Sequence, residues 1–300
     1  MKGKCCCASK NWNVANIGSQ DGKHVVVTGG NSGIGYYTAL ELARAGAIVV
    51  IACRDAVRGT EALSVLKKEL PEARISLETV DLSDLVSVRL FADKYLATGK
   101  PLDVLVNNAG IMALPQREQT ADGFERQFGT NHLGHFALTG LLLPALRKSS
   151  SPRVVNVSSS AASFGKIELD NLQSERLYKP MRTYAQSKLA NLAFTLELGK
   201  RISWLTSVAS HPGGAVTNLQ KYQFKNLVAL VGQHASQGAL PSLRAAVEGS
   251  ATGTFYGPKY WFHMRGAPIE VKLPGGSQND VTNGALWQES VRLTGVDYQL

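Results

Sequence analysis

The sequence predicts an α/β protein in which one doubly wound parallel sheet carries helices on both faces. From His24 onward, short apolar runs alternate with amphipathic stretches of helix length, the pattern of consecutive βαβ units. The runs are apolar throughout, as expected of strands that are buried on both faces of a parallel sheet. No linker rich in Pro, Gly or Ser interrupts the alternation after residue 21, so we expect a single domain over residues 21–300.

Each strand is assigned to a short run of apolar, mostly β-branched residues between turn-forming residues. We expect strands at residues 25–28, 48–53, 75–80, 104–106, 154–157, 208–210 and 254–256. The amphipathic stretches between them predict helices. These span residues 34–45, 56–70, 85–95, 124–147, 183–200 and 237–248.

The composition fits a soluble globular protein. Apolar residues make up 44% of the 300 residues, and Lys and Arg exceed Asp and Glu by 32 to 23, a net charge of +9 that makes anionic ligands candidates. The basic residues are spread along the chain, which argues against nucleic-acid binding. No apolar stretch approaches the ~20 residues of a spanning helix, so no membrane span is expected.

Residues 1–20 are interpreted as an N-terminal extension or surface strap, because they lack periodicity. Cys5, Cys6 and Cys7 are consecutive and cannot build a disulfide framework, and no nearby His completes a zinc site. Neither a secretory signal nor a metal site is indicated, and we expect a reducing, cytoplasmic location. The sequence assigns no role to the cysteine triplet.

A glycine-rich turn joins the first predicted strand to the first predicted helix, between Thr28 and Gly35. Glycines let the backbone turn tightly and approach a pyrophosphate, which the helix N-terminus attracts. The spacing is G-x3-G-x-G, not G-x-G-x-x-G, and a turn that binds no phosphate is the alternative. In a Rossmann-type fold we expect cofactor contacts from Gly29, Asn31, Ser32, Gly33, Ile34 and Gly35.

The end of the second strand bears on the choice of cofactor. An acidic residue there would hold the ribose hydroxyls of NAD, but here Arg54 follows Cys53. A guanidinium matches the geometry and charge of a phosphate, so Arg54 predicts NADP(H), with Arg58 as a candidate helper. We expect Asp55 to cap the next helix rather than to bind ribose.

A tyrosine and a lysine lie four residues apart at the start of a predicted helix, at Tyr184 and Lys188. That spacing places both on one helix face, where the ammonium would favour the ionised phenol and make it a better acid–base group. Alone, such a pair is usually surface packing. Polar residues at two strand ends join it: Ser158, Ser159 and Ser160 after the fifth strand, and residues 107–110 (NNAG) after the fourth.

With these motifs together, residues 21–257 resemble the short-chain dehydrogenase/reductase family. The resemblance implies that Tyr184 donates and accepts the proton, and that Lys188 binds the nicotinamide ribose and lowers the tyrosine pKa. It further implies that Ser159 orients the substrate carbonyl and that Asn131 holds a water in the proton relay. Additional cofactor contacts are implied for Asp81, Leu82, Asn108, Ala109, Gly110, Pro212, Gly213 and Thr217.

Residues 131–136 (NHLGHF) narrow the resemblance to the branch of the retinol dehydrogenases and WW-domain oxidoreductases, whose members mostly use NADP. We therefore expect an NADP(H)-dependent enzyme that interconverts hydrophobic alcohols with ketones or aldehydes by hydride transfer. The membrane-anchoring N-terminal helix of animal members is not expected here. The alternatives are a reductase of a conjugated C=C bond and a catalytically silent NADP-binding sensor or scaffold.

The remaining segments give weaker indications. Residues 215–236 are expected to form a substrate lid, and residues 257–300 a C-terminal segment whose aromatic cluster at 256–264 lines a pocket, joins the core or contacts a subunit. His132, His135 and His211 are interpreted as packed histidines, with no metal ligand among them. A homodimer or homotetramer is compatible with the sequence. The specific substrate, its stereochemistry, the physiological direction and the strictness of the NADP preference stay open.

Overall fold

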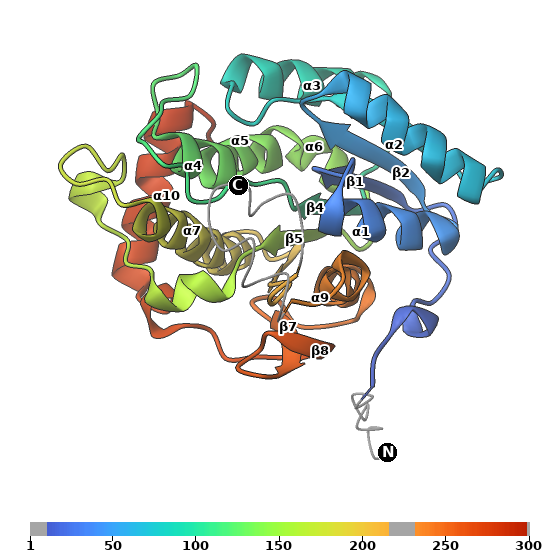
Figure 1. The fold of residues 1–300 in the computed structure, drawn as a ribbon. Coiled ribbons are helices and arrows are strands. Elements are labelled where there is room, and N and C mark those ends of the chain that lie inside the picture. The colour runs from blue at the N-terminus through green and yellow to red at the C-terminus, as the bar shows by residue number, and fades with distance from the viewer. Residues whose placement is uncertain (1–10, 216–231, 299–300) are drawn as a thin grey trace.

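The computed structural model describes residues 11–215 and 232–298, and in this part of the chain eight strands form one sheet (Figure 1). The strand order is β3-β2-β1-β4-β5-β6-β7-β8, with β1 to β7 parallel and β8 antiparallel at the edge. The doubly wound α/β fold is thus confirmed. The strands are His24–Thr28 (β1), Ile48–Cys53 (β2), Ile75–Thr79 (β3), Val104–Asn107 (β4), Arg153–Val157 (β5), Thr206–Ser210 (β6), Phe255–Tyr260 (β7) and Arg265–Glu270 (β8).

Helices cover both faces of the sheet, as the sequence predicted (Figure 1). The α-helices are Gly33–Arg44 (α1), Ala56–Glu69 (α2), Leu85–Ala97 (α3), Arg126–Phe128 (α4), Gly134–Leu141 (α5), Leu143–Leu146 (α6), Pro180–Arg201 (α7), Ala235–Val247 (α9) and Asp280–Thr294 (α10). Short 3-10 turns lie at Val14–Asn16 (η1), Ser160–Phe164 (η3), Leu169–Asn171 (η4) and Gly275–Ser277 (η6), and Gly129–Leu133 (η2) is π-helical.

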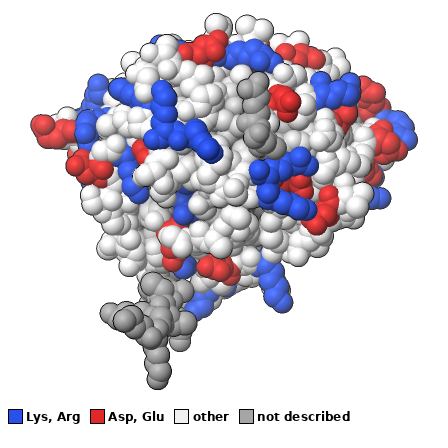
Figure 2. Space-filling view, turned by 180° about the vertical axis from the view of Figure 1, so that it is seen from behind, with Lys and Arg blue, Asp and Glu red and all other residues white. Residues whose placement is uncertain are grey.

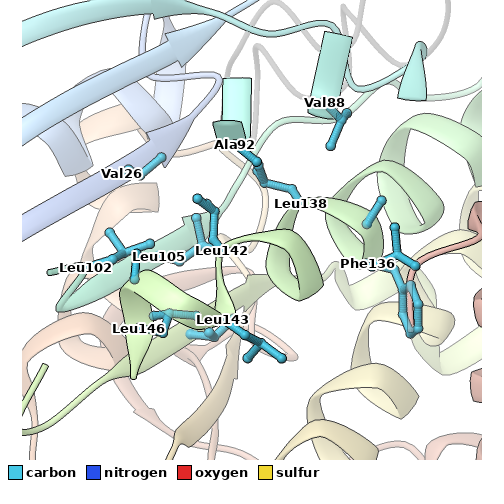
Figure 3. Packing of buried hydrophobic residues seen from close by; sticks show 14 of the residues in the cluster. Val26, Val88, Ala92, Leu102, Leu105, Phe136, Leu138, Leu142, Leu143 and Leu146 are labelled. Carbon is cyan, nitrogen blue, oxygen red and sulfur yellow. The ribbon is translucent and has the colours of Figure 1, made fainter. Parts of the chain in front are cut away.

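The core is divided into layers by the alternation of side chains along each strand. In β1, Val26 packs with residues of α3, α5, α7 and α10, whereas Val25 and Val27 face α1 and α9 on the other side. Figure 3 shows the first of these layers, where Val26 and Leu105 from the sheet lie near Leu142 of the helical layer. Both faces of the central strands are therefore dry, which explains their uninterrupted apolar sequence.

The described residues of the N-terminal extension pack onto this core. Trp12 is buried in the layer of α1 and α9, and the Gln20 amide donates to the carbonyl of Ala45 at the end of α1 (2.8 Å). Residues 11–20 thus form a strap along the molecule, one of the two forms that the sequence allowed.

The helix predicted over residues 124–147 is wrong as a continuous element. The buried carboxylate of Glu125 accepts from the amides of Gln127 (2.9 Å) and Phe128 (2.7 Å), so the helix begins only after Glu125. It then widens to the π-helix η2 and breaks at Leu142, two residues before Pro144, which has no amide proton to continue the ladder.

Two C-terminal elements escaped prediction. Strand β8 contains Gly266 and Pro268, residues that disfavour strands, and Pro268 is tolerated because β8 is an edge strand. Helix α10 buries Asn283 and Ser290 beside Leu286 and Trp287, so its inner face shows no clean apolar stripe. Most of the expected lid, residues 216–231, lies outside the described residues.

Charge on the molecule is mixed. Figure 2 shows Lys and Arg side chains interspersed with Asp and Glu over the face seen from behind. Ion pairs at the surface join Arg74 to Asp21 and Lys94 to Glu78. On this face the net positive charge is therefore not gathered into one broad basic surface of the kind that binds nucleic acids.

We expect Phe136→Ala to lower the free energy of unfolding by about 3–5 kcal/mol, because it removes a fully buried ring from the layer in Figure 3. Phe136 packs against the rings of Phe194, Trp287 and Tyr298. Phe164→Ala is the matched control, since that ring is 89% exposed and its loss changes stability by less than about 0.5 kcal/mol. Urea unfolding of both variants measures the difference, and equal effects would contradict this description of the core.

Candidate active site

The candidate site lies where the strand order reverses. Strand β1 pairs with β2 on one side and β4 on the other, and in open α/β sheets ligands bind outside the carboxyl ends of the strands at such a point. Here the ends of β1, β4 and β5 bring together the glycine-rich turn, residues 107–110 and residues 158–160. The start of α7 packs against the turn η3 that follows β5 and contributes Tyr184 and Lys188.

The glycine-rich turn forms a backbone cradle. Gly29 has a φ of 67°, and a Cβ on it would lie 3.1 Å from the Cα of Ala109. At Gly35 a Cβ would lie 2.4 Å from Asn108 Nδ2 and from the carbonyl of Gly29, so a side chain cannot fit there. The side chain of Ser32 makes no capping hydrogen bond at the start of α1. This combination of a side-chain-free turn and a helix N-terminus fits a pyrophosphate group.

The hydroxyl of Thr28 joins the ends of β1 and β4. It accepts hydrogen bonds from the amides of Asn108 (2.9 Å) and Ala109 (3.0 Å), and the side chain of Asn108 donates to the Thr28 carbonyl (2.7 Å). Asn107 extends this connection by donating to Thr139 (3.0 Å) and to Asn156 of β5 (2.8 Å). Asn108 and Ala109, two of the predicted cofactor contacts, are thus held directly against the glycine-rich turn.

His135 connects the Thr28 hydroxyl to the π-helix η2. Its Nδ1 faces the carbonyl of Asn131 (3.0 Å), which only accepts, so Nδ1 carries the proton. Its Nε2 then accepts from the hydroxyl of Thr28 (2.9 Å), whose own acceptor positions are taken by two amides. Complete burial lowers the pKa of His135 to about 3, so the ring is neutral. His135 is a packed histidine, as interpreted from sequence, but a fully hydrogen-bonded one.

Tyr184 and Lys188 are both buried on the inner face of α7. The Lys188 ammonium donates to the carbonyl of Val157 at the end of β5 (3.1 Å) and lies 6.0 Å from the centre of the Tyr184 ring. A Cβ on Gly110 would lie 3.3 Å from Lys188 Nζ and 3.0 Å from Asn131 Oδ1, so the absence of a side chain at Gly110 keeps this space open.

The three consecutive serines have different partners. Ser158 donates to the carbonyl of Lys188 (2.7 Å), and Ser160 contacts Met264 Sδ (4.0 Å). Ser159 caps η3, and it lies close enough to the Tyr184 hydroxyl to lower that group's pKa. Ser159 is therefore the serine that faces Tyr184, the arrangement expected for the one chosen from the sequence.

Burial sets the protonation of the pair. It raises the pKa of Tyr184 to about 12, and the neighbouring Ser159 side chain opposes that rise. Burial also lowers the pKa of Lys188 to about 8. In the protein without cofactor, burial is the largest influence on the pKa of the phenol, and the expectation that Lys188 lowers this pKa stays a prediction. At neutral pH Tyr184 is a neutral acid and Lys188 is mostly an ammonium.

Asn131 occupies the middle of η2. Its amide donates to the Ile111 carbonyl (3.0 Å) and to Ser187 Oγ (2.9 Å), while its side-chain oxygen accepts from the Ile111 amide (2.9 Å). Ser187 in turn donates to the carbonyl of Tyr184 (2.7 Å). Asn131 therefore ties the loop after β4 to the first turns of α7.

At the other end of the cradle, Arg54 is the exposed residue after β2. Its side chain is 59% exposed and lies 3.9 Å from the Asp81 carboxylate, which also accepts from the amide (2.9 Å) and hydroxyl (2.6 Å) of Ser83. Asp55 accepts from the Arg58 amide (3.0 Å), which confirms that it caps α2. Leu82 is buried, with its carbonyl against Gly134.

The segment after β6 carries the remaining predicted contacts. Gly213 has a φ of 65°, and a Cβ on it would lie 2.4 Å from the Met264 carbonyl. His211 is buried against Gly257, and burial lowers its pKa to about 3, so it is a neutral packed histidine, as expected. Pro212 lies between them and accepts from Gln233 (3.0 Å). Thr217 lies outside the described residues.

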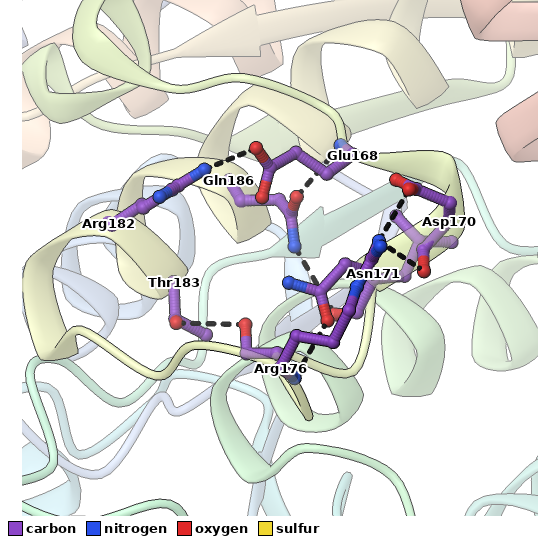
Figure 4. Close-up of polar contacts among 9 residues, drawn as sticks. Glu168, Asp170, Asn171, Arg176, Arg182, Thr183 and Gln186 are labelled. Carbon is purple, nitrogen blue, oxygen red and sulfur yellow. Dashed lines mark hydrogen bonds and ion pairs between the residues drawn. The ribbon is translucent and has the colours of Figure 1, made fainter.

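The connection between β5 and α7 is fastened to the first turns of α7 (Figure 4). Gln186 accepts from the Glu168 amide (3.0 Å) and donates to the Leu172 carbonyl (3.2 Å), and Arg182 forms an ion pair with Glu168. These bonds hold the chain on both sides of Tyr184. Among the described residues, no group of His, Cys, Asp and Glu is placed to hold a metal ion.

Comparisons with known proteins agree with this geometry. Residues 23–227 match the short chain dehydrogenase family, and the chain belongs to it. It is 40% identical to mouse retinol dehydrogenase 12 over 290 residues, or 93% of this chain and 88% of the relative, so it falls in the retinol dehydrogenase-like branch.

Solved structures give the same fold. An uncharacterized protein from Mycobacterium paratuberculosis superposes with a TM-score of 0.83 at 41% identity, covering 97% of this chain and all of that one. A short chain dehydrogenase from Burkholderia cenocepacia in complex with NADP has a TM-score of 0.62 at 25% identity, covering 78% of this chain and 95% of that one. The described helices include none long and apolar enough to cross a membrane.

Sequence reasoning missed two members of the site. Thr28 stood inside the glycine motif but received no role, and His135 was treated as packing alone. The signals available in the sequence were a threonine at the end of an apolar strand and a histidine four residues after Asn131. The four-residue spacing places His135 Nδ1 on the Asn131 carbonyl.

We expect the phenol of Tyr184 to stay protonated in the protein without cofactor until the pH exceeds about 11, because burial raises its pKa to about 12. Tyrosinate absorbance measured against pH for the wild type minus Tyr184→Phe isolates this group, with circular dichroism recorded to verify folding. A Tyr184 step near neutral pH would contradict the burial argument and favour the ammonium effect.

Proposed function

We propose that this chain is an NADP(H)-dependent oxidoreductase that interconverts hydrophobic alcohols with their ketones or aldehydes, and that it works in the cytoplasm. The observation that carries the proposal is the burial of Tyr184 and Lys188 one helical turn apart on α7, with Ser159 beside the phenol, at the sheet edge that holds the glycine cradle. Family membership supports oxidoreductase chemistry, and similarity to retinol dehydrogenase 12 supports an apolar alcohol as the substrate class.

The cradle fits a dinucleotide, which Gly29, Asn31, Ser32, Gly33, Ile34 and Gly35 would hold through its pyrophosphate. Asp81 and Leu82 would flank the adenine, and Asn108, Ala109 and Gly110 the adenosine side. When bound, the nicotinamide supplies or accepts a hydride. Lys188 would bind the nicotinamide ribose, and Pro212, Gly213 and Thr217 would border the ring.

Arg54 supports NADP(H) over NAD(H). Its exposed guanidinium lies beside the end of β2, where a 2′-phosphate would be placed, and such a charge-assisted pair is bidentate and specific. The neighbouring Asp55 is engaged as the cap of α2 and does not compete for the ribose. The similarity to an NADP-bound family member points the same way.

The chain's own groups then handle the oxygen and the proton. Ser159 and Tyr184 would both donate hydrogen bonds to the carbonyl oxygen, whose negative charge grows as the hydride arrives. The neutral Tyr184 phenol gives up its proton to that oxygen, a transfer eased by the nearby Lys188 ammonium. Asn131, in the middle of η2, would hold the water that returns a proton toward the site.

We expect Tyr184→Phe to reduce kcat/KM by a factor of about 100 to 10,000, because it removes the proton donor. NADPH affinity should change less than about threefold, since the phenol contributes little to cofactor binding. Initial rates of NADPH and NADH oxidation with aldehydes and ketones of graded size measure turnover, and cofactor titration measures affinity. Tyr95→Phe, in α3, is the matched control and should keep the wild-type rate.

Substantial turnover by Tyr184→Phe would refute the role of the phenol. A preference of the wild type for NADH would overturn the argument from Arg54 and leave the chemistry intact. Product formed only from conjugated alkenes would favour a C=C reductase, and cofactor binding without any turnover would favour a sensor.

A further inference from the structure

The turn between β7 and β8 presents large aromatic side chains to solvent. Trp261 is 67% exposed and Phe262 is 98% exposed, and Tyr260 before them is exposed as well. The other tryptophans are sheltered: Trp12 and Trp287 are buried and Trp204 is partly buried. Phe164 at the end of η3 is also exposed, and Ser160 at the start of η3 contacts Met264 of the turn. We call Phe164, Tyr260, Trp261 and Phe262 the aromatic rim.

The backbone of this turn is strained in a way that keeps these rings outside. Trp261, Phe262 and His263 have φ angles of 54°, 53° and 64°, so three consecutive residues with bulky side chains adopt the left-handed conformation that favours glycine. The turn is closed by the Met264 amide on the Tyr260 carbonyl (3.0 Å) and by His263 on the Pro258 carbonyl (2.9 Å). Phe262 stays exposed, so no burial of its ring offsets this strain within the protein. This indicates that the ring contacts another surface.

The charges around the rim favour an anionic surface. Lys259 and Arg265 flank the three aromatic residues of the turn, and both are exposed. The Lys259 ammonium lies 5.0 Å from the centre of the Tyr260 ring. No acidic residue occurs in the sequence between Glu248 and Glu270. Exposed Trp, Tyr and Phe beside Lys and Arg form the composition that binds at the boundary of lipid headgroups and acyl chains.

The rim also borders the candidate active site. The Gly214 amide donates to the Met264 carbonyl (2.9 Å), so the turn abuts the segment predicted to lie beside the nicotinamide. Ser160 links the turn to the serine that faces Tyr184. Figure 1 places the β7–β8 hairpin at the outer edge of the molecule, where the sheet ends. Any partner surface that binds the aromatic rim would therefore lie next to the candidate active site.

We propose that the aromatic rim is a docking surface for an anionic lipid bilayer, into whose interface Trp261 and Phe262 insert while Lys259 and Arg265 contact the headgroups. This goes beyond the proposed function, and it would let an apolar alcohol or carbonyl compound reach the site from the lipid. Attachment is peripheral, through a turn.

The full chain is tested with vesicles of phosphatidylcholine containing about 30% phosphatidylserine. We expect it to sediment with these vesicles, and Trp261 emission, obtained as wild type minus Trp261→Phe, to shift to the blue and to be quenched by brominated lipid. The double variant Trp261→Ser/Phe262→Ser should lose at least about tenfold in partitioning. The matched control Val57→Ser/Val65→Ser, which replaces two exposed apolar residues of α2, should bind like the wild type.

Lys259→Gln/Arg265→Gln should remove the preference for phosphatidylserine over phosphatidylcholine alone. Absence of vesicle binding, or equal loss in the rim and control variants, would overturn the proposal. So would a rim that proves to be a subunit contact, revealed if the serine variant dissociates an oligomer in sedimentation velocity. Because the readout is binding and not turnover, failure here is distinguishable from failure of the proposed chemistry.

Discussion

The hydroxyl of Thr28 is the group on which the candidate site depends. At the carboxyl ends of the neighbouring strands β1 and β4, it accepts hydrogen bonds from two amides of the loop after β4 and donates one to His135. Thr28 and His135 are fully buried and the two amides belong to partly buried residues, and hydrogen bonds away from water are strong while an unpaired partner there is costly. Through the neutral His135 the same network reaches the Asn131 carbonyl, so the cofactor cradle and the π-helix are held in one arrangement.

Burial sets the protonation states of the two central side chains of the site. Tyr184 and Lys188 are buried away from water. Desolvation raises the pKa of Tyr184 and lowers the pKa of Lys188, which favours the neutral form of each. Buried groups with pKa values displaced in this way are typical of functional sites. The fold accommodates them because α7 is fastened on both sides, by Ser187 to Asn131 and by Gln186 to the preceding loop. A rigid first turn of α7 keeps the phenol against Ser159.

The sequence predicted what depends on local pattern and order. The parallel strands, the glycine cradle and the capping role of Asp55 follow from apolar runs, glycine spacing and helix starts, and each is present in the structure. What it could not predict depends on tertiary contacts. The helix predicted over residues 124–147 starts later because Glu125 caps it, and it breaks at Leu142 because of Pro144. Helix α10 was missed because its buried face carries polar residues. The Thr28–His135 bond joins residues 107 positions apart, a pairing that no local pattern reveals.

The most direct test of the central claim follows the hydride itself. NADPH with deuterium at both C4 positions of the nicotinamide is incubated with the protein and a long-chain α,β-unsaturated aldehyde, and the product is analysed by mass spectrometry and NMR. The proposed chemistry predicts an allylic alcohol with deuterium on the carbinol carbon and an intact double bond. Deuterium on the β-carbon of a saturated aldehyde would contradict it, as would unlabelled product or none.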